Sequence, residues 1–196
     1  RYCDVMFSGG HMTEFYIDLN DNDSFMCSSD NTIYDNPVHL CVCESCGYRT
    51  DFEHVSDSFS LKRKNYDLSI TYDGYYVASL KLKETVQRKS LKGIEFIQLK
   101  EEPDFFVMFV RNVVCFDMEK RNSRRINLCS NCGNYESIVG ATPAFLIEKL
   151  PSDICRSDVM FGSGNGKHPL LFSSQYFADI VEKEKLKGIK FEPVRT

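Results

Sequence analysis

Two short cysteine motifs constrain the fold of this chain more than any other feature. Residues Cys43–Gly47 and Cys129–Gly133 both read C-x-x-C-G, and we call them the first and the second knuckle. Two residues between the cysteines let a tight turn direct both sulfurs to one point, and the glycine accommodates a positive φ that brings backbone N–H groups to the thiolates. Two such turns supply the four thiolates of a structural zinc site. The predicted Zn²⁺ ligands are Cys43, Cys46, Cys129 and Cys132.

The spacing of the knuckles is unusual for a zinc ribbon. Between Cys46 and Cys129 lie 82 residues, against roughly 15–20 in a compact ribbon. The intervening chain must therefore fold as a lobe and bring the knuckles back together. A redox dithiol can also read C-x-x-C, but it lies where a strand leads into a helix, and neither knuckle is followed by an amphipathic helical pattern. Metal binding is the preferred interpretation, and Cys41 would be a reserve ligand or a near neighbour.

The cysteine count and the net charge bear on the compartment and on nucleic acid as a partner. The chain has nine cysteines, an odd number, and shows neither a secretory signal pattern nor an apolar run of about 18 residues. We therefore expect a cytoplasmic protein that does not enter a membrane. Cys115 is predicted to be a small core residue and Cys155 a structural cysteine, with a reactive thiol as the alternative for Cys155. The net charge of −4 makes nucleic acid an unlikely partner.

The first residues have the pattern of a cloning remnant. Gly9-Gly10-His11-Met12 is typical of a protease site followed by a cloning junction. We interpret residues 1–11 as an expression-tag remnant and assign no function to Cys3 or His11. Residues 12–196 are predicted to form one α+β domain with two pseudo-equivalent halves, residues 12–104 and 105–196.

A repeat supports the two halves. Ser79–Phe96 and Ser174–Phe191 match at a constant offset of 95, and the knuckles repeat at an offset of 86. Each segment predicts a serine N-cap, a helix, a glycine that ends the helix as a left-handed cap, and a strand. The matched pairs are Ser79 and Ser174, Val86 and Val181, Leu91 and Leu186, Lys92 and Lys187, Gly93 and Gly188, Ile94 and Ile189, and Phe96 and Phe191.

Strands outnumber helices in the remaining pattern, which predicts a mainly antiparallel sheet. Phe105–Met118 is apolar and predicts one long strand or two consecutive buried strands. Tyr66–Tyr72 predicts a strand that ends in the turn Asp73-Gly74. The other expected strands are Glu14–Leu19, Val38–Val42 and Arg125–Leu128.

Several further motifs carry no catalytic pattern. The run Lys120–Arg125, here the basic segment, is predicted to be a solvated hairpin tip. Gly162–Lys167 lacks the phosphate-loop pattern, because His168 follows the lysine, and it predicts a flexible loop. His39, His54 and His168 are scattered. No assembled catalytic constellation is visible, so we expect a protein that is not an enzyme.

The knuckles, the element Asp153-Ile154-Cys155-Arg156 and the terminal segment Ser173–Phe191 occur in a recognisable order. In this order the sequence resembles the double-CXXCG motif family of immunity proteins, found in bacterial polymorphic toxin systems. The resemblance covers Leu128–Val194 best, does not extend to Thr50–Asp104, and departs from the family pattern at Cys155, where a bulky apolar residue is usual.

The resemblance implies an antidote that binds and neutralises a cognate toxin stoichiometrically. An acidic surface would suit a basic nuclease toxin. The expected contact residues are the loop Asp21–Asp30 and the tyrosines Tyr72, Tyr75 and Tyr76, for which burial is the alternative. The second hypothesis is a zinc-ribbon adaptor that contacts nucleic acid through the basic segment, residues 120–125. A redox enzyme that uses the knuckles is the third.

Overall fold

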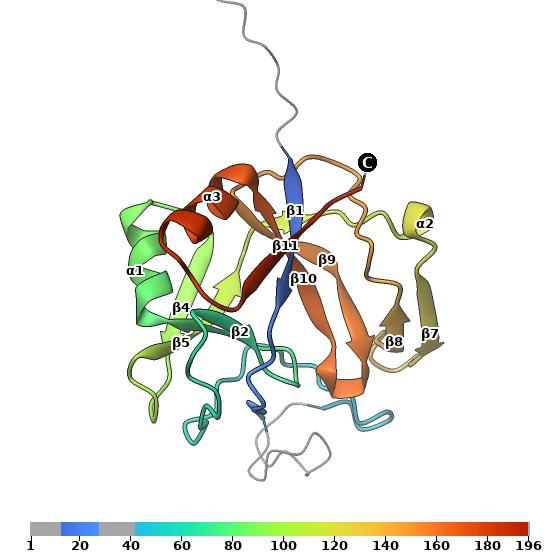
Figure 1. Ribbon diagram of the computed structural model, residues 1–196. Coiled ribbons are helices and arrows are strands. Elements are labelled where there is room, and N and C mark those ends of the chain that lie inside the picture. Colours follow the sequence, from blue (N-terminus) through green and yellow to red (C-terminus); the bar gives the residue numbers. More distant parts are fainter. Residues whose placement is uncertain (1–12, 28–41, 196) are drawn as a thin grey trace, which may run out of the picture.

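Two sheets, built mainly from antiparallel strands, form the framework of the molecule (Figure 1). The computed structural model describes residues 13–27 and 42–195. The predicted tag remnant, Cys41, His39 and most of the expected strand Val38–Val42 lie outside the described residues. Within them, the predicted mixed fold with mainly antiparallel sheets and a four-cysteine cluster is confirmed.

The large sheet has the strand order β11-β1-β10-β9-β8-β7, and β6 pairs in parallel with β9. All its other strand pairs are antiparallel. Its strands are β1 (Glu14–Leu19), β6 (Val113–Val114), β7 (Arg124–Leu128), β8 (Tyr135–Val139), β9 (Ile154–Ser163), β10 (His168–Ser174) and β11 (Ile189–Pro193).

The small sheet has the order β2-β3-β5-β4 and is antiparallel throughout. Its strands are β2 (Leu68–Ile70), β3 (Tyr76–Ser79), β4 (Ile94–Gln98) and β5 (Phe105–Val110). Helices α1 (Leu80–Arg88) and α3 (Gln175–Lys183) lie side by side, and Arg88 forms an ion pair with Glu184 at 2.9 Å (Figure 1). The short helix α2 (Met118–Arg121) and the 3₁₀ turn η1 (Gly164–Gly166) complete the described elements.

Most strand predictions are confirmed, with changes in length. The expected strand Glu14–Leu19 is β1, and Arg125–Leu128 is β7 with one residue added. The apolar run Phe105–Met118 forms the two strands β5 and β6, interrupted at the polar pair Arg111-Asn112, and its last residue begins α2. The strand predicted over Tyr66–Tyr72 is shortened to β2.

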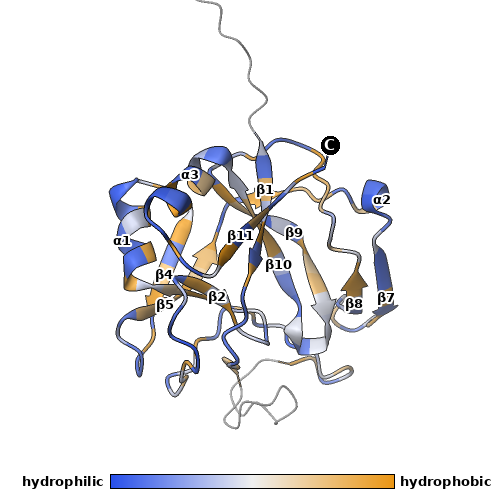
Figure 2. Ribbon diagram, viewed as in Figure 1, coloured by the Kyte–Doolittle hydropathy of each residue, from blue (hydrophilic) through white to orange (hydrophobic). Residues whose placement is uncertain are grey.

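The core follows the two-residue alternation of the strands. In β10, Leu171 belongs to the cluster between the sheets and the helices, whereas Phe172 belongs to the cluster on the opposite face of the large sheet. A third cluster, which includes Val77 and Val107, covers the outer face of the small sheet. Hydrophobic side chains accordingly concentrate in the strands, while α2 and β7 are hydrophilic (Figure 2).

The same alternation determines how deeply two of the cysteines are buried. Cys155 is fully buried in the second cluster, as expected of a structural cysteine, and burial raises the pKa of its thiol to about 11. The prediction that Cys115 is a core residue is wrong, because its neighbours Val114 and Phe116 occupy the buried positions and Cys115 is only half-buried.

The two helices begin alike. The Ser79 hydroxyl accepts a hydrogen bond from the N–H of Leu82, and the Ser174 hydroxyl accepts one from the N–H of Phe177, so both predicted N-caps are confirmed. Each cap hydroxyl also donates to a carboxylate at 2.7 Å: Ser79 to Asp67 and Ser174 to Asp153.

The helices also end alike, but not at the predicted residue. The left-handed residues are Ser90 and Lys185, with φ of 54° and 53°. The N–H of Leu91 bonds to the carbonyl of Val86, and the N–H of Leu186 to that of Val181, which is the Schellman pattern. The prediction that glycine supplies this cap is therefore wrong, because burial of each leucine against the helix fixes the end three residues earlier.

Gly93 and Gly188 do have positive φ, 72° and 90°, and directly precede β4 and β11. The prediction of a left-handed glycine followed by a strand is confirmed at both positions. A Cβ on Gly93 would lie 2.3 Å from the Asn112 side chain, and one on Gly188 would lie 2.3 Å from the Leu68 carbonyl oxygen. Each glycine thus permits a close approach between elements that are distant in the sequence.

Lys185 provides a test of the helix end. We expect Lys185→Gly to stabilise the protein by about 0.5–1 kcal/mol, because glycine adopts positive φ without steric cost. Glu182→Gly, in the last turn of α3, should instead cost about 1 kcal/mol. Urea unfolding of both variants measures the difference, and a destabilised Lys185→Gly protein would contradict the assigned cap.

Candidate metal centre

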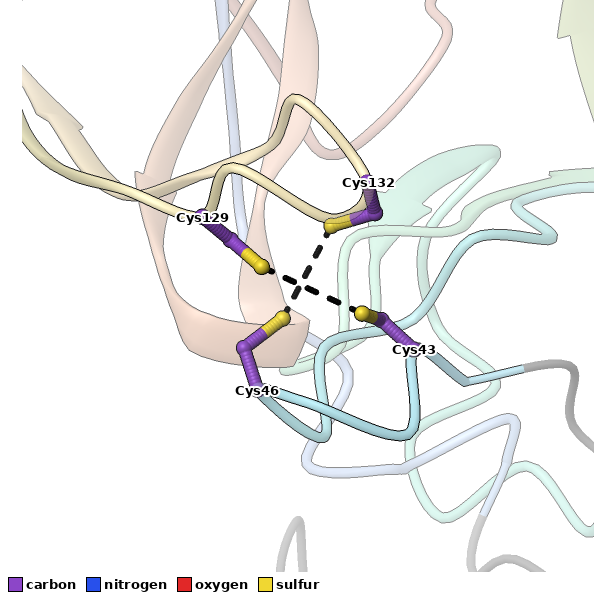
Figure 3. A group of neighbouring side chains, drawn as sticks. All are labelled: Cys43, Cys46, Cys129 and Cys132. Atoms are coloured by element: carbon purple, nitrogen blue, oxygen red, sulfur yellow. Dashed lines mark hydrogen bonds between the residues drawn. The ribbon is translucent and has the colours of Figure 1, made fainter.

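The two knuckles converge on one point (Figure 3). The first is a loop closed by a bridge between Val42 and Arg49, and the second is the hairpin loop between β7 and β8. The sulfur atoms of Cys43, Cys46, Cys129 and Cys132 all lie within 4.8 Å of one another. The lobe between the knuckles therefore brings them back together, as their sequence predicts.

The separations of the sulfurs suit a tetrahedral metal ion. Cys43 Sγ lies 3.9 Å from Cys129 Sγ, and Cys46 Sγ lies 3.7 Å from Cys132 Sγ. Four sulfurs at about 2.3 Å from a central ion stand about 3.8 Å apart at the corners of a tetrahedron. A disulfide would need about 2.05 Å. The four sulfurs could thus hold a metal ion, and tetrahedral thiolate sites take Zn²⁺ or iron.

The backbone of each knuckle is folded in the same way. The N–H of Gly47 bonds to the carbonyl of Cys43 at 2.7 Å, and that of Gly133 bonds to the carbonyl of Cys129 at 2.9 Å. Both glycines have φ of 71°. The predicted positive φ after each C-x-x-C is confirmed.

The pKa values of the clustered thiols are shifted in different directions. Backbone N–H groups of Cys46 and Ser45 lower the pKa of Cys43 to about 6. Those of Cys132 and Asn131 lower the pKa of Cys129. At Cys46 the N–H of Tyr48 also lowers the pKa, but burial and the three neighbouring sulfurs outweigh it and raise the pKa to about 12. Mutual repulsion opposes four thiolates in this space, and a divalent cation would relieve it.

The loop Gly162–Lys167 supports the centre. The backbone N–H of Arg49 donates to Asn165 Oδ1 at 2.7 Å, and Lys167 donates to the carbonyl of Tyr135 beyond the second knuckle. Lys167 is only 4% exposed and lies 5.3 Å from the Tyr48 ring. The predicted loop is instead the end of β9 followed by the turn η1. Its contacts reach Arg49 and Tyr135, each of which lies two residues beyond a knuckle. The sequence signal for Lys167 was weak, a single cation in a glycine-rich segment.

The remaining predicted residues lie apart from this centre. The basic segment forms the end of α2 and the start of β7, which corrects the predicted hairpin tip, although most of it stays exposed. Arg121 donates to the Thr142 carbonyl, and Arg125 lies 5.8 Å from the Tyr135 ring. Tyr75 and Tyr76 are buried, and of the three candidate contact tyrosines Tyr72 is exposed.

Among the described residues, the four knuckle cysteines form the one group of three or more side chains arranged to hold a metal ion. No helix in the described part of the chain is long and apolar enough to cross a membrane. Comparison of the sequence with models of known families finds no match, and a search of curated proteins finds none either.

Proposed function

We propose that the protein is a zinc-stabilised immunity protein that neutralises a cognate toxin by binding it. The observation that carries the proposal is the convergence of two C-x-x-C-G knuckles, 82 residues apart, on one cluster of four sulfurs within 4.8 Å of one another. That arrangement agrees with the order of motifs on which the resemblance to double-CXXCG immunity proteins rests. Zinc is preferred to iron as the structural ion because it has no redox chemistry.

Residues on which the resemblance rests make hydrogen bonds that stabilise the fold. Asp153 accepts a hydrogen bond from the hydroxyl of Ser174, the N-cap of α3. The N–H of Leu186 bonds to the carbonyl of Val181 at the C-terminal end of α3. Residues with such structural roles specify a fold that related proteins can share. Recognition of one particular toxin would therefore depend on other surface residues. An exposed cluster lies there: Tyr72 donates to Asp23 at 2.7 Å, and Arg63 pairs with the same carboxylate at 2.6 Å.

This cluster has the composition of a binding hot spot. Tyr72 is 46% exposed and packs against Phe25 with 5.0 Å between the ring centroids. Tyrosine and arginine are the residues that dominate protein interfaces. We therefore place the toxin contact at Tyr72 and Arg63, on the side of the small sheet near β2.

Co-expression with the toxin candidate encoded beside this chain tests the proposal. We expect a stable complex and rescue of growth, and we expect Tyr72→Ala to weaken the complex at least 10-fold. Tyr176→Ala is the matched control, because Tyr176 is 48% exposed on α3. No complex and no protection would contradict the immunity function, whereas equal effects of the two variants would contradict only the assigned face.

The same preparation separates the other two hypotheses. Nucleic-acid binding through the basic segment would be salt-sensitive and would weaken when Arg124 and Arg125 become alanine. A redox enzyme would reduce disulfides and lose that activity in Cys43→Ser. Either result, without toxin binding, would replace the immunity proposal.

We also propose that the framework is an internal duplication. Asp67 and Asp153 precede β2 and β9 at the knuckle offset of 86. The strand orders β2-β3-β5-β4 and β9-β10-β1-β11 then correspond, with α1 matching α3. Contacts between the units are reciprocal. The carbonyl of Lys187 accepts a hydrogen bond from the N–H of Leu68, the first residue of β2. At the corresponding positions, the side-chain amide of Asn112 donates to the carbonyls of Lys92 and of Ile154, the first residue of β9.

A further inference from the structure

A cleft of about 150 Å³ lies between the two sheets, and none of the four clustered cysteines lines it. Its apolar floor includes Met108 of β5 and Leu171 of β10, both of which are buried. Its rim includes Glu53 and Arg111, both exposed. The cleft therefore connects the interior of the molecule with solvent.

Arg156 lies in this cleft on a strand face that otherwise packs inward. In β9, Ile154 belongs to the core between the sheets, and Arg156 is the next residue on the same face. Arg156 pairs across the strands with Leu171 of the floor. Its Nη1 donates to the carbonyl of Ser157 at 3.1 Å, and no carboxylate in the described part of the chain pairs with it.

Arg49 brings a second cation to the cleft. It is 3% exposed, and its guanidinium lies 4.6 Å from the Phe52 ring and 4.9 Å from the Tyr75 ring. Nη2 donates to the carbonyl of Asp73 at 3.0 Å, whereas Nε has no acceptor among the described residues. Arg49 is thus a fixed, buried charge with no ion-pair partner in the described residues.

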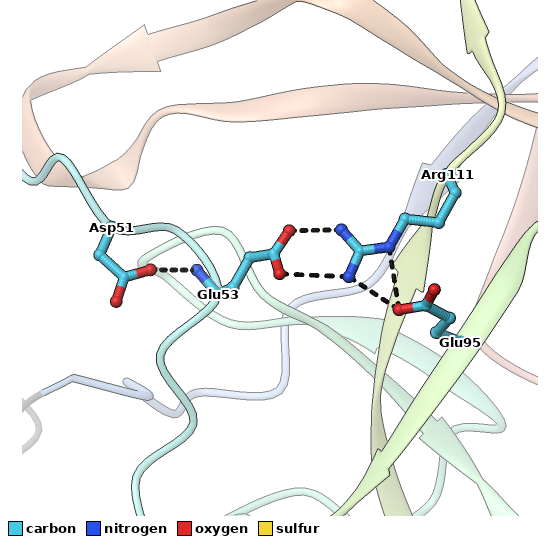
Figure 4. Close-up of polar contacts among 4 residues, drawn as sticks. All are labelled: Asp51, Glu53, Glu95 and Arg111. Carbon is cyan, nitrogen blue, oxygen red and sulfur yellow. Dashed lines mark hydrogen bonds and ion pairs between the residues drawn. The ribbon is translucent and has the colours of Figure 1, made fainter.

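The carboxylate that lines the cleft is already engaged. Both oxygens of Glu53 accept from Arg111, and Arg111 also donates to Glu95 (Figure 4). These hydrogen bonds lower the pKa of Glu53, so it stays ionised on Arg111. The charge of Arg156 contributes to this lowering, but Glu53 forms its hydrogen bonds with Arg111. Neither Arg49 nor Arg156 therefore has a carboxylate within ion-pair distance among the described residues.

We propose that this cleft binds a carboxylate carried on a compact apolar body. Cations that lack an ion-pair partner beside an apolar floor are costly, and a carboxylate would pair with them through charge-assisted hydrogen bonds. A cavity of about 150 Å³ has room for a body about the size of a benzene ring. The carboxylate comes either from a free small molecule or from an acidic side chain of a protein partner.

Titration with benzoate tests the site, followed by NMR shifts of the cleft residues. We expect saturable binding to the isolated wild-type chain, and binding of the neutral isostere benzamide that is at least 10-fold weaker. Arg156→Gln should weaken benzoate binding about 10- to 100-fold, because it removes a charged donor. Arg195→Gln, which removes an exposed arginine elsewhere, should leave the affinity unchanged.

A parallel titration with the capped peptide acetyl-Gly-Asp-Gly-amide identifies the source. Tighter benzoate binding supports a free small carboxylate, and tighter peptide binding supports an acidic side chain. Benzamide binding as tight as that of benzoate, or binding of neither acid, overturns the proposal even if Arg156→Gln fails to fold. Because these titrations use no toxin, their failure leaves the immunity function untouched.

Discussion

Cys132→Ser should lower the free energy of unfolding by several kcal/mol and abolish stoichiometric zinc binding. A structural zinc site needs four ligands, and the remaining three sulfurs cannot supply the fourth. Because the knuckles come from distant parts of the chain, the binding free energy of the ion is also folding free energy. Thermal unfolding and elemental analysis of protein purified without chelator measure both effects.

Cys115→Ser is the matched control for this variant. Cys115 is half-buried and lies outside the metal centre, so its replacement should change stability by less than about 1 kcal/mol. Wild-type protein should contain about one zinc per chain and melt at a lower temperature after treatment with EDTA. A metal-free preparation with an unchanged melting curve would contradict the structural zinc.

Gly188→Ala should cost about 3 kcal/mol or more. The added Cβ would lie 2.3 Å from the Leu68 carbonyl oxygen and 2.8 Å from Tyr66 Cβ. The backbone cannot move aside easily, because the N–H groups of Asp67 and Leu68 both bond to the carbonyl of Lys187. The clash adds to the cost of about 1–2 kcal/mol that a non-glycine residue pays at positive φ.

Gly164→Ala separates the cost of the steric clash from the cost of positive φ. Gly164 has φ of 55°, and a Cβ there would meet nothing within 4 Å, so this variant should pay the conformational cost alone. Urea unfolding of both variants gives the difference. Equal costs would show that the contact between Gly188 and Leu68 is loose in solution.

The metal centre was the most predictable part of the molecule. Cysteine spacing fixes where sulfurs point within a knuckle, and the glycine after each pair fixes the turn. The four cysteines that meet could therefore be named without knowing the path of the chain between them. The serine N-caps were also predictable from the residues next to them. Each knuckle and each N-cap depends on residues within a few positions of one another, where steric and hydrogen-bond rules act directly. The meeting of the two knuckles could be expected because one zinc ion needs the ligands of both.

Features that depend on distant contacts were beyond sequence reasoning. No motif joins Arg49 to Arg156, because the cleft arises only when the strands of two sheets face each other. The helix ends were misplaced, since glycine is the usual left-handed cap and burial of Leu91 and Leu186 decided otherwise. Asp67 and Asp153 could have been found, because the offset of 86 between the knuckles also relates these two residues.

The place of β1 in the large sheet bears on how the chain is made. β1 is the first strand of the described chain, yet it pairs only with β10 and β11, the last two. On the ribosome, β1 has both edges open until β10 and β11 have been synthesised, whereas β2 to β5 can pair as soon as they emerge. The small sheet can therefore form before the large sheet, which closes only after β10 and β11 have emerged.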